Sequence, residues 1–469
     1  MGTPLTVSPK CPPPLDRDFL PAVLWNRAFQ DWGIASDGGR PFGVALEQPD
    51  GSISVYQTKI LSDTVSNAEE LNFRFVERLV KFLLWQRGGF RVYLGGDPSV
   101  SDAVAAMYQD GGARDFDSKF MGEKAYRKPF EMVGVEWSEL PEANESVMAL
   151  GGHLEGCRIG FDLGGSDRKC AAVIDGKVVF SEEVEWDPYF QSDPQYHLDG
   201  IQHSLERAAE HLPRVDAIGG SAAGIYVNNE ARVGSLFRGV PEDVFEKRVR
   251  RLFSDVRKKW GGVPFQIVND GEVTALAGAM ASGETGVLGV AMGTSEAVGF
   301  VTPAGNITTW LNELAFAPID YRPDAPTDEW SGGVGAGAQY LSQQAVARLA
   351  TAQNGFEFPE DLPLPERLKK VQEKADAGDP AGERIFETIG RYFGYAVAHY
   401  ADFYDMNQVL VLGRVTSGAG GDILLRQTRN VLETEFPELA GTIRFRTPDE
   451  TEKRHGQAVA AASLPAIPP

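Results

Sequence analysis

The sequence predicts an α/β protein, and two observations lead to this expectation, while a third indicates its turns. Apolar residues at helical spacing over 67–87 predict an amphipathic helix, and similar spacing recurs over 384–404. After each of these helices comes a short apolar strand that ends at a glycine, over 90–94 and over 408–412. Glycine supplies 52 of the 469 residues, about 11 % against a typical ~7 %, without a collagen period. The glycines are therefore expected at tight turns between the elements.

Composition excludes several classes of protein. The chain has 45 Lys and Arg against 66 Asp and Glu, a net charge of −21, which argues against a nucleic-acid partner. No stretch approaches the ~18 apolar residues of a membrane span, and the beginning of the chain lacks a signal-peptide core. The three cysteines, Cys11, Cys157 and Cys170, are too few and scattered for a disulfide framework or a structural zinc site. These features favour a cytoplasmic protein.

The region 1–150 is expected to form an α/β extension. A hairpin is predicted about the turn Pro49-Asp50-Gly51, because short apolar strands flank it. A helix, a strand and a second helix should follow over 67–87, 90–94 and 101–108, and the polar stretch 111–127 is expected to be a loop. The role of this region stays open among a cap over a cleft, a dimer surface and a decayed lobe.

Two predicted hairpins share one design. Each places small residues and a hydroxyl between two strands, at Gly164-Gly165-Ser166 and at Gly293-Thr294-Ser295. Such turns let backbone N–H groups approach phosphate oxygens, and Asp162 before the first turn is suited to hold Mg²⁺ through water. The strand–turn–strand order excludes dinucleotide and Walker loops, whose glycines open a helix. Taken alone, each hairpin is also compatible with an ordinary glycine turn.

A polar pair ends the strand that lies between the two hairpins. Asn269 and Asp270 follow an apolar segment and precede a predicted helix over 273–281. A carboxylate at a strand end that faces a cleft is a candidate base for a substrate hydroxyl. Without the flanking hairpins, Asn-Asp-Gly would predict only a turn.

In this order, the motifs resemble the ROK family of bacterial sugar kinases and repressors, a branch of the actin-like ATPase superfamily of hexokinase, heat-shock chaperones and actin. The likeness covers roughly 157–462 and rests on five segments: Ile159–Ser166, Gly220–Gly224, Val268–Asp270, Gly289–Ser295 and Val409–Gly413. It implies two ribonuclease-H-like lobes around a cleft. The first lobe, 157–266, would carry the first phosphate hairpin. The second lobe, 267–462, would carry the second hairpin and the adenosine motif.

The resemblance also implies roles for individual residues. ATP would phosphorylate a hydroxyl of a sugar or sugar-like polyol, with Asp270 as the base and Asp162 positioning Mg²⁺ through water. The two turns, Gly164, Gly165, Ser166 and Gly293, Thr294, Ser295, would bind the phosphates, and Gly413 would admit the adenosine. Asn269, Glu313 and Ser221 would contact the acceptor. No membrane or nucleic-acid partner is implied, and a homo-oligomer is compatible with the family.

The sequence departs from the family pattern on the acceptor side. Phe316 stands where a histidine is usual, and the best match for a second sugar-binding glutamate is Ala338. The cysteine-rich zinc loop is replaced by the glycine-rich stretch 330–337, so no zinc is expected. Missing hydrogen-bond partners weaken the binding of a polyol sharply. A kinase for an amino sugar or a cyclitol and a non-catalytic sugar or nucleotide sensor therefore remain as alternatives.

Other conspicuous residues are expected to have structural roles. The six histidines are scattered without metal-ligand spacing, and the basic run 247–259 predicts a solvated helix face, with anion binding as the less favoured alternative. Trp85, Trp186 and Trp310 are expected in the core or at its rim, although stacking on a sugar is the alternative for each.

Overall fold

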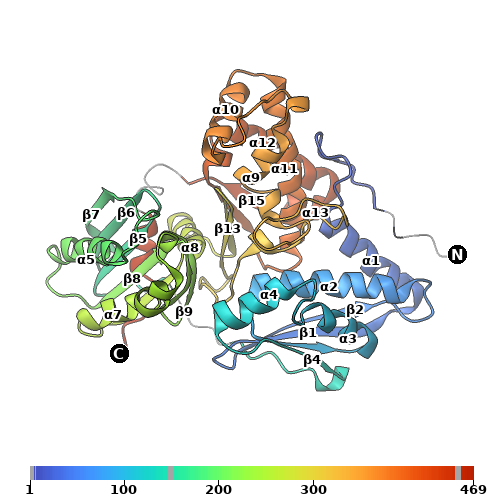
Figure 1. Ribbon diagram of the computed structural model, residues 1–469, viewed down its shortest axis with the longest axis horizontal. Coiled ribbons are helices and arrows are strands. Elements are labelled where there is room, and N and C mark those ends of the chain that lie inside the picture. Colours follow the sequence, from blue (N-terminus) through green and yellow to red (C-terminus); the bar gives the residue numbers. More distant parts are fainter. Residues whose placement is uncertain (1–4, 6, 146–150, 449–455, 469) are drawn as a thin grey trace.

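The computed structural model describes residues 5, 7–145, 151–448 and 456–468. Figure 1 shows three parts: an N-terminal domain in blue to cyan, a first lobe mainly in green, and a second lobe mainly in yellow to red. The figure places elements of the second lobe next to both other parts. Among the described residues, no helix is long and apolar enough to cross a membrane.

The N-terminal domain has a four-stranded sheet in the order β2-β1-β3-β4. Strand β1 pairs antiparallel with β2 and β3, and β3 pairs parallel with β4. The strands are β1 (Arg40–Glu47), β2 (Ile53–Ile60), β3 (Arg91–Gly95) and β4 (Glu131–Val135), and the helices are α1 (Ala22–Asp37), α2 (Ala68–Arg87) and α3 (Pro98–Met107). The expected hairpin, helices and strand are present, and α1 and β4 are additional.

The expected loop over 111–127 is wrong. Helix α4 (Asp115–Lys119) continues there into a π-helix, Phe120–Tyr126. The polar composition is misleading because Asp117 is buried and accepts hydrogen bonds from Lys81 Nζ (2.9 Å) and Trp85 Nε1 (2.8 Å) on α2. A helix that is polar in sequence can therefore pack through a buried ion pair.

The first lobe is built on a five-stranded sheet in the order β11-β8-β5-β6-β7. Strands β5, β6 and β7 form an antiparallel meander, and β8 and β11 add to it in parallel. The elements are β5 (Cys157–Leu163), β6 (Asp167–Ile174), β7 (Lys177–Glu185), α5 (Gln195–Ala209), β8 (Ala217–Ala222), β9 (Gly224–Val227), β10 (Glu230–Gly234), α6 (Glu242–Val244), α7 (Leu252–Lys259) and β11 (Phe265–Asn269). Because β11 belongs to this sheet, the sheet extends to Asn269, which is three residues beyond the end expected for the first lobe at position 266.

The second lobe repeats most of this strand plan. Its sheet has the order β13-β12-β14-β15, in which β12 and β13 are antiparallel and β14 and β15 follow in parallel. The position of a third meander strand is reduced to one bridge between Val301 and Ile307. The elements are α8 (Asp270–Ser282), β12 (Val287–Met292), β13 (Glu296–Val301), α9 (Gln343–Leu349), α10 (Leu364–Asp376), α11 (Pro380–Ala401), β14 (Gln408–Leu412), α12 (Gly418–Glu435), α13 (Pro437–Ala440) and β15 (Arg444–Arg446). The chain thus has two ribonuclease-H-like lobes, as expected.

Helix α14 (Gln457–Ala462) returns to the first lobe and packs on β5 and β8. A Cβ at Gly160 would lie 1.7 Å from the carbonyl oxygen of Ala458, and one at Gly219 would lie 1.7 Å from that of Ala461. Only glycine allows the helix backbone to approach the strands this closely. The last described helix of the chain therefore covers a sheet that begins about 300 residues earlier.

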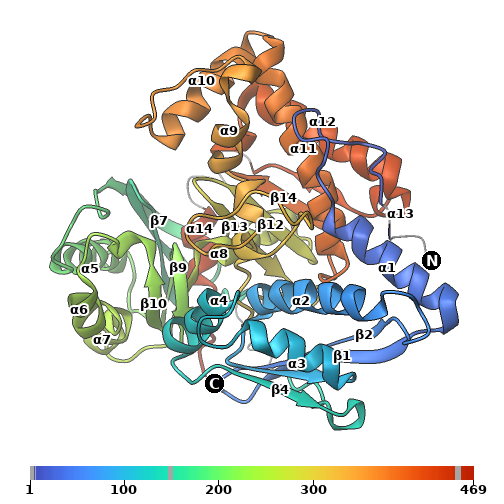
Figure 2. The ribbon, with the colours of Figure 1, turned by 45° about the vertical axis from the view of Figure 1, so that its right-hand side comes forward.

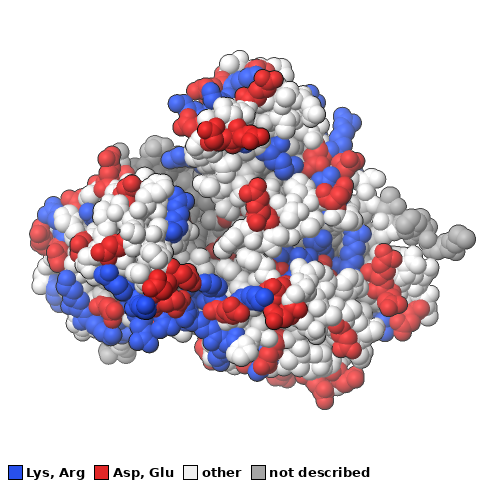
Figure 3. Space-filling view, viewed as in Figure 1, with Lys and Arg blue, Asp and Glu red and all other residues white. Residues whose placement is uncertain are grey.

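The basic run 247–259 lies on and just before α7. Leu252, Phe253 and Val256 are buried, whereas Arg248 and Lys258 form ion pairs with Asp193 and Asp255 on the surface. In Figure 3, blue side chains gather on the same side of the first lobe as α7 in Figure 1. This arrangement is that of a solvated amphipathic helix face.

Candidate active site

The first glycine turn closes between β5 and β6. The Gly164 N–H donates to the Asp167 carbonyl (2.9 Å), and the Gly164 carbonyl accepts from Trp186 Nε1 (2.8 Å). Ser166 is exposed at the tip, and its hydroxyl donates to an Asp167 carboxylate oxygen (3.1 Å). Trp186 therefore stabilises the turn through this hydrogen bond, which gives the tryptophan a structural role.

The second glycine turn touches the predicted adenosine turn. The Gly293 N–H donates to the Ser295 carbonyl (3.0 Å), and Thr294 and Ser295 are exposed. Gly413 has φ +100°, and a Cβ there would lie 2.4 Å from the Met292 carbonyl oxygen. A side chain at position 413 would therefore push the strand β14 end away from the hairpin. The fold brings together two motifs that lie 120 residues apart.

A cavity of about 750 Å³ opens beside Gly413. Its walls come from α8, the end of β14 and the loop that leads into α12; Thr274, Gly278, Arg414, Ser417, Asp422 and Gln457 are among the lining residues. The volume lies in the range of ligand pockets, about 300–1,000 Å³. The cavity is large enough for a nucleoside, and Arg414 supplies a positive charge at its rim.

Asp162 lies near the end of β5, where it is 5 % exposed. It is paired in register with Ser221 of the neighbouring strand β8, and Lys169 Nζ lies 4.0 Å from its Oδ2. Burial raises the pKa of Asp162 to about 6, while Lys169 and the Ser221 hydroxyl lower it and Asp270 raises it. Ser221 is fully buried, and among the described residues its hydroxyl has no hydrogen-bond partner.

Asp270 begins α8, directly after β11. Asn269 caps this helix: its Oδ1 accepts from the Gly271 N–H (2.7 Å), and its Nδ2 donates to the Gly224 carbonyl (2.7 Å). The Gly271 N–H also donates to Asp270 Oδ1 (3.0 Å), and this bond lowers the pKa of Asp270. Burial outweighs the bond and raises that pKa. The carboxyl is thus a stronger base than an exposed aspartate.

Glu313 shares its surroundings with two glutamates that the sequence did not indicate. Burial raises the pKa of Glu313, Glu272 and Glu296 to about 8 each, and Asp270 further raises that of Glu313. Glu272 accepts from Asn312 Nδ2 (2.5 Å), and Glu296 Oε1 accepts from the Tyr400 hydroxyl (2.9 Å). At neutral pH these three carboxyls hold protons and can donate hydrogen bonds. In the sequence, only their positions could have indicated that these two glutamates belong to the site. Glu272 follows Asp270 by two residues, and Glu296 follows the second turn directly.

Phe316 and Ala338, the two apolar residues that depart from the family pattern, both pack against other side chains. The Phe316 ring is 4.5 Å from that of Trp85 on α2 and 5.2 Å from that of Trp330, which is 57 % exposed. Ala338 is buried, and a Cβ at the preceding Gly337 would lie 2.2 Å from Glu296 Oε2. Among the described residues, this oxygen has no hydrogen-bond partner. The surroundings of Phe316 and Ala338 therefore combine an aromatic cluster with a carboxyl from β13.

A small cavity of about 130 Å³ lies at the meeting point of the three parts of the molecule. Asn269, Glu272 and Tyr226 line it together with Trp310 and, from the N-terminal domain, Gln48. Gln48 Nε2 donates to the Thr309 carbonyl (3.1 Å), which ties the β1–β2 hairpin to this wall. The N-terminal domain thus reaches the predicted acceptor residues.

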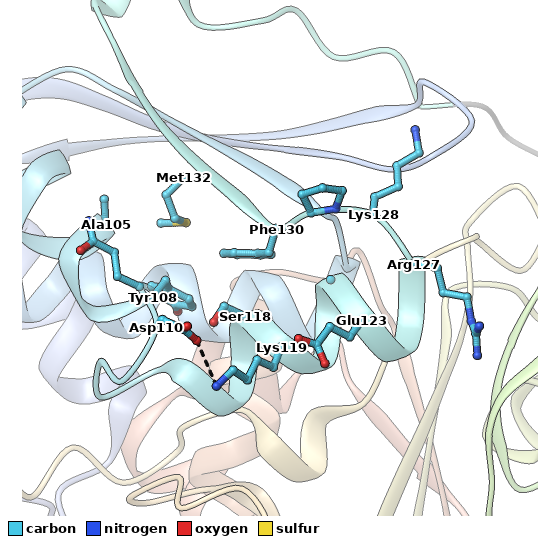
Figure 4. Close-up of a pocket in the computed structure, with 13 residues that line it drawn as sticks. Ala105, Tyr108, Asp110, Ser118, Lys119, Glu123, Arg127, Lys128, Phe130 and Met132 are labelled. Atoms are coloured by element: carbon cyan, nitrogen blue, oxygen red, sulfur yellow. Dashed lines mark ion pairs between the residues drawn. The ribbon is translucent and has the colours of Figure 1, made fainter. Parts of the chain in front are cut away.

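A further cavity, of about 640 Å³, lies within the N-terminal domain and contains none of the predicted site residues. Figure 4 shows its apolar side chains, Phe130 and Met132, beside the ion pair between Lys119 and Asp110 (3.1 Å). Its lining residues all lie between positions 105 and 132, and none belongs to either glycine turn. The described part of the chain has no group of three or more His, Cys, Asp or Glu side chains that could hold a metal ion.

Comparison with known proteins places this geometry in a known fold. A ROK hexokinase from Thermus thermophilus matches with a TM-score of 0.51 and 20 % identity, over 65 % of this chain and 97 % of that one. A ROK family transcriptional regulator, a homolog of the E. coli MLC protein, matches with a TM-score of 0.50 and 18 % identity, over 66 % and 79 %. The chain has the fold of the ROK proteins. About a third of the chain, a share similar in length to the N-terminal domain, lies outside these matches.

A ROK family glucokinase from Streptomyces griseus, solved with glucose and AMPPNP, matches with a TM-score of 0.49 and 23 % identity, over 66 % of this chain and 99 % of that one. No protein-family model matches the sequence, and no curated protein matches it.

Proposed function

We propose that this ROK-fold chain transfers the γ-phosphoryl group of ATP to a hydroxyl of a sugar or sugar-like polyol. One observation carries the proposal: Asp270 affects the pKa of Asp162 on one side and of Glu313 on the other. A carboxyl that is coupled to both lies near the residue proposed for the nucleotide side and the residue proposed for the acceptor side, which is compatible with a base for phosphoryl transfer. The similarity in fold to a ROK hexokinase supports the same reaction class.

In this proposal, Asp270 accepts the proton of the attacking hydroxyl as the oxygen bonds to the γ-phosphorus. The bond between that phosphorus and the β–γ bridging oxygen breaks, and ADP leaves. The raised pKa of Asp270 suits a base near neutral pH. Glu313, whose proton stays bound below about pH 8, donates a hydrogen bond to an acceptor oxygen, and the Asn269 amide orients a second one.

The nucleotide side would bind the phosphates through the two glycine turns and the adenosine in the cavity beside Gly413. Asp162 fits the role of an oxygen ligand for Mg²⁺ through water, because its buried carboxyl lies at the strand end that leads into the first turn. When bound, Mg²⁺ would neutralise charge on the phosphates. Ser221, which is paired in register with Asp162 on β8, would pack next to that residue. We further propose a cytoplasmic protein that acts on a small molecule, without a nucleic-acid or membrane partner.

A second candidate is a sugar or nucleotide sensor without catalysis. The specific observation in its favour is the packing of Phe316 on Trp85, together with the buried Ala338, which leaves fewer polar groups for a polyol. The similarity in fold to a ROK family transcriptional regulator is compatible with this candidate. The retained Asp270 favours the kinase.

The deciding experiment measures ADP release from Mg-ATP across hexoses, amino sugars, cyclitols and linear polyols. The kinase proposal predicts stimulation by at least one acceptor, and loss of that stimulation in Asp270→Asn. If no acceptor stimulates ADP release while a sugar or nucleotide binds by calorimetry, the sensor replaces the kinase.

A further inference from the structure

The last turn of α2 in the N-terminal domain binds the segment that carries Glu313. The Asn312 N–H donates to the Gln86 carbonyl (2.8 Å), and the Glu313 N–H donates to the Trp85 carbonyl (3.0 Å). Carbonyl groups in the last turn of a helix have no partner within the helix. Here a second-lobe segment satisfies two of them, and both views of the ribbon show α2 on the side of its sheet that faces the second lobe (Figures 1 and 2).

Cationic side chains of α2 bind the loop that follows, residues 320–337. Arg74 Nη2 donates to the Tyr321 carbonyl (2.5 Å), and Arg78 Nη1 donates to the Val334 carbonyl (3.0 Å). The Arg78 guanidinium also lies 5.7 Å from the centre of the Tyr321 ring. Residues four apart on a helix share one face, so both arginines reach the same loop.

The loop itself has little regular structure. Between residues 320 and 336, all of them described, it forms no helix or strand. One isolated bridge joins Thr327 to Val334 within it, and two more hold its ends, from Asp320 to Pro21 and from Ala336 to Pro318. Its end lies against the site, because Gly337 adjoins Glu296 Oε2 and its N–H donates to the Ala317 carbonyl (3.0 Å). A loop without its own secondary structure takes its position from what it packs against.

We propose that α2 is a positioning element for the acceptor side of the site. Its carbonyl groups fix the backbone of Glu313, and Arg74 and Arg78 hold the loop 320–337 against Glu296. This inference rests on the proposed function, in which Glu313 contacts the acceptor. It gives the N-terminal domain a role that is separate from nucleotide binding, since none of the residues that line the 750 Å³ cavity comes from that domain.

The test compares the full-length protein with Arg78→Met, Arg74→Met/Arg78→Met and the conservative Arg78→Lys. The exposed Arg384 of α11 supplies the matched control, Arg384→Met. Hydrogen exchange of peptides within 320–337 should be at least ~5-fold faster in both Met variants, intermediate in Arg78→Lys and unchanged in the control. With the best acceptor of the panel, the acceptor KM should rise at least ~5-fold and the ATP KM should stay constant.

Two results would overturn the inference. Unchanged exchange in the double variant would show that α2 does not hold the loop. Faster exchange with an unchanged acceptor KM would show that the loop does not position the acceptor. If the wild-type protein turns over no acceptor, the proposed function fails instead; the exchange rates then still decide whether α2 holds the loop.

Discussion

Replacing Asp270 by asparagine removes the proposed base while it changes the local packing little. The asparagine oxygen can still accept the Gly271 N–H that now lies 3.0 Å from Asp270 Oδ1, and Asn269 still caps α8. The helix loses a negative charge at its first position, worth about 0.3–1 kcal/mol, but it also loses a buried charge whose pKa is raised by burial. These effects oppose each other, so we expect a melting temperature close to that of the wild type.

The catalytic effect should be much larger. A positioned general base contributes about 10²–10⁴-fold, so kcat should fall by that factor, equivalent to about 3–5 kcal/mol of transition-state stabilisation. Because Asp270 raises the pKa of Asp162 and Glu313, both values should also fall in the variant.

The assay is coupled ADP release, with ADP affinity by titration and thermal unfolding measured on the same preparation. Asp255→Asn on α7, an exposed carboxylate-to-amide change, is the control. A kcat within about threefold of the wild type would refute the assignment of Asp270. A variant that fails to bind ADP would instead show that the substitution disturbs the nucleotide side.

Three further predictions concern nucleotide binding and stability. Gly413→Ala should lower stability by about 1–3 kcal/mol and weaken ADP binding, because φ is +100° and the Met292 carbonyl lies 2.4 Å from the added Cβ; unfolding and ADP titration measure both. Lys81→Met should cost about 3–5 kcal/mol in urea unfolding, because it leaves Asp117 buried without its cation. The pKa of Glu296 is about 8 in the folded protein against 4.5 ordinarily, so between these values the folded chain holds a proton that the unfolded chain releases. The free energy of unfolding should therefore fall from pH 5 to pH 8. Glu296→Gln should make that slope less steep in urea titrations, while Glu272 and Glu313 maintain the rest of it; a slope as steep as that of the wild type would contradict the prediction.

Much of the fold could be predicted because its signals are local. The apolar stripe of α2, the turn at Pro49-Asp50-Gly51 and the apolar strand β14 each lie within about twenty residues, and all three are present. The two glycine turns, in order with Asn269 and Asp270, carry the resemblance to the ROK family, and that resemblance implied the two lobes.

What could not be predicted depends on contacts between distant segments. The polar sequence of α4 predicts a loop, because its packing depends on the bond between Asp117 and Lys81, which lies 36 residues earlier. From the sequence, Glu296 is an ordinary strand residue. Its burial depends on contacts with Gly337 and Tyr400, which are distant in sequence. The roles of the site residues remain predictions, because spacing can place side chains in one cleft but cannot assign the chemistry of a substrate.

The place of α14 in the fold affects how the protein is made. During synthesis, the N-terminal domain and nearly all of the second lobe emerge before residues 457–462, which cover β5 and β8 at Gly160 and Gly219. The apolar face of the first lobe therefore stays open until residues 457–462 have been synthesised, and chaperones can bind it during that time. A chain that stops before residue 457 would contain every predicted site residue, yet its first lobe would remain uncovered and its nucleotide cavity would lack Gln457.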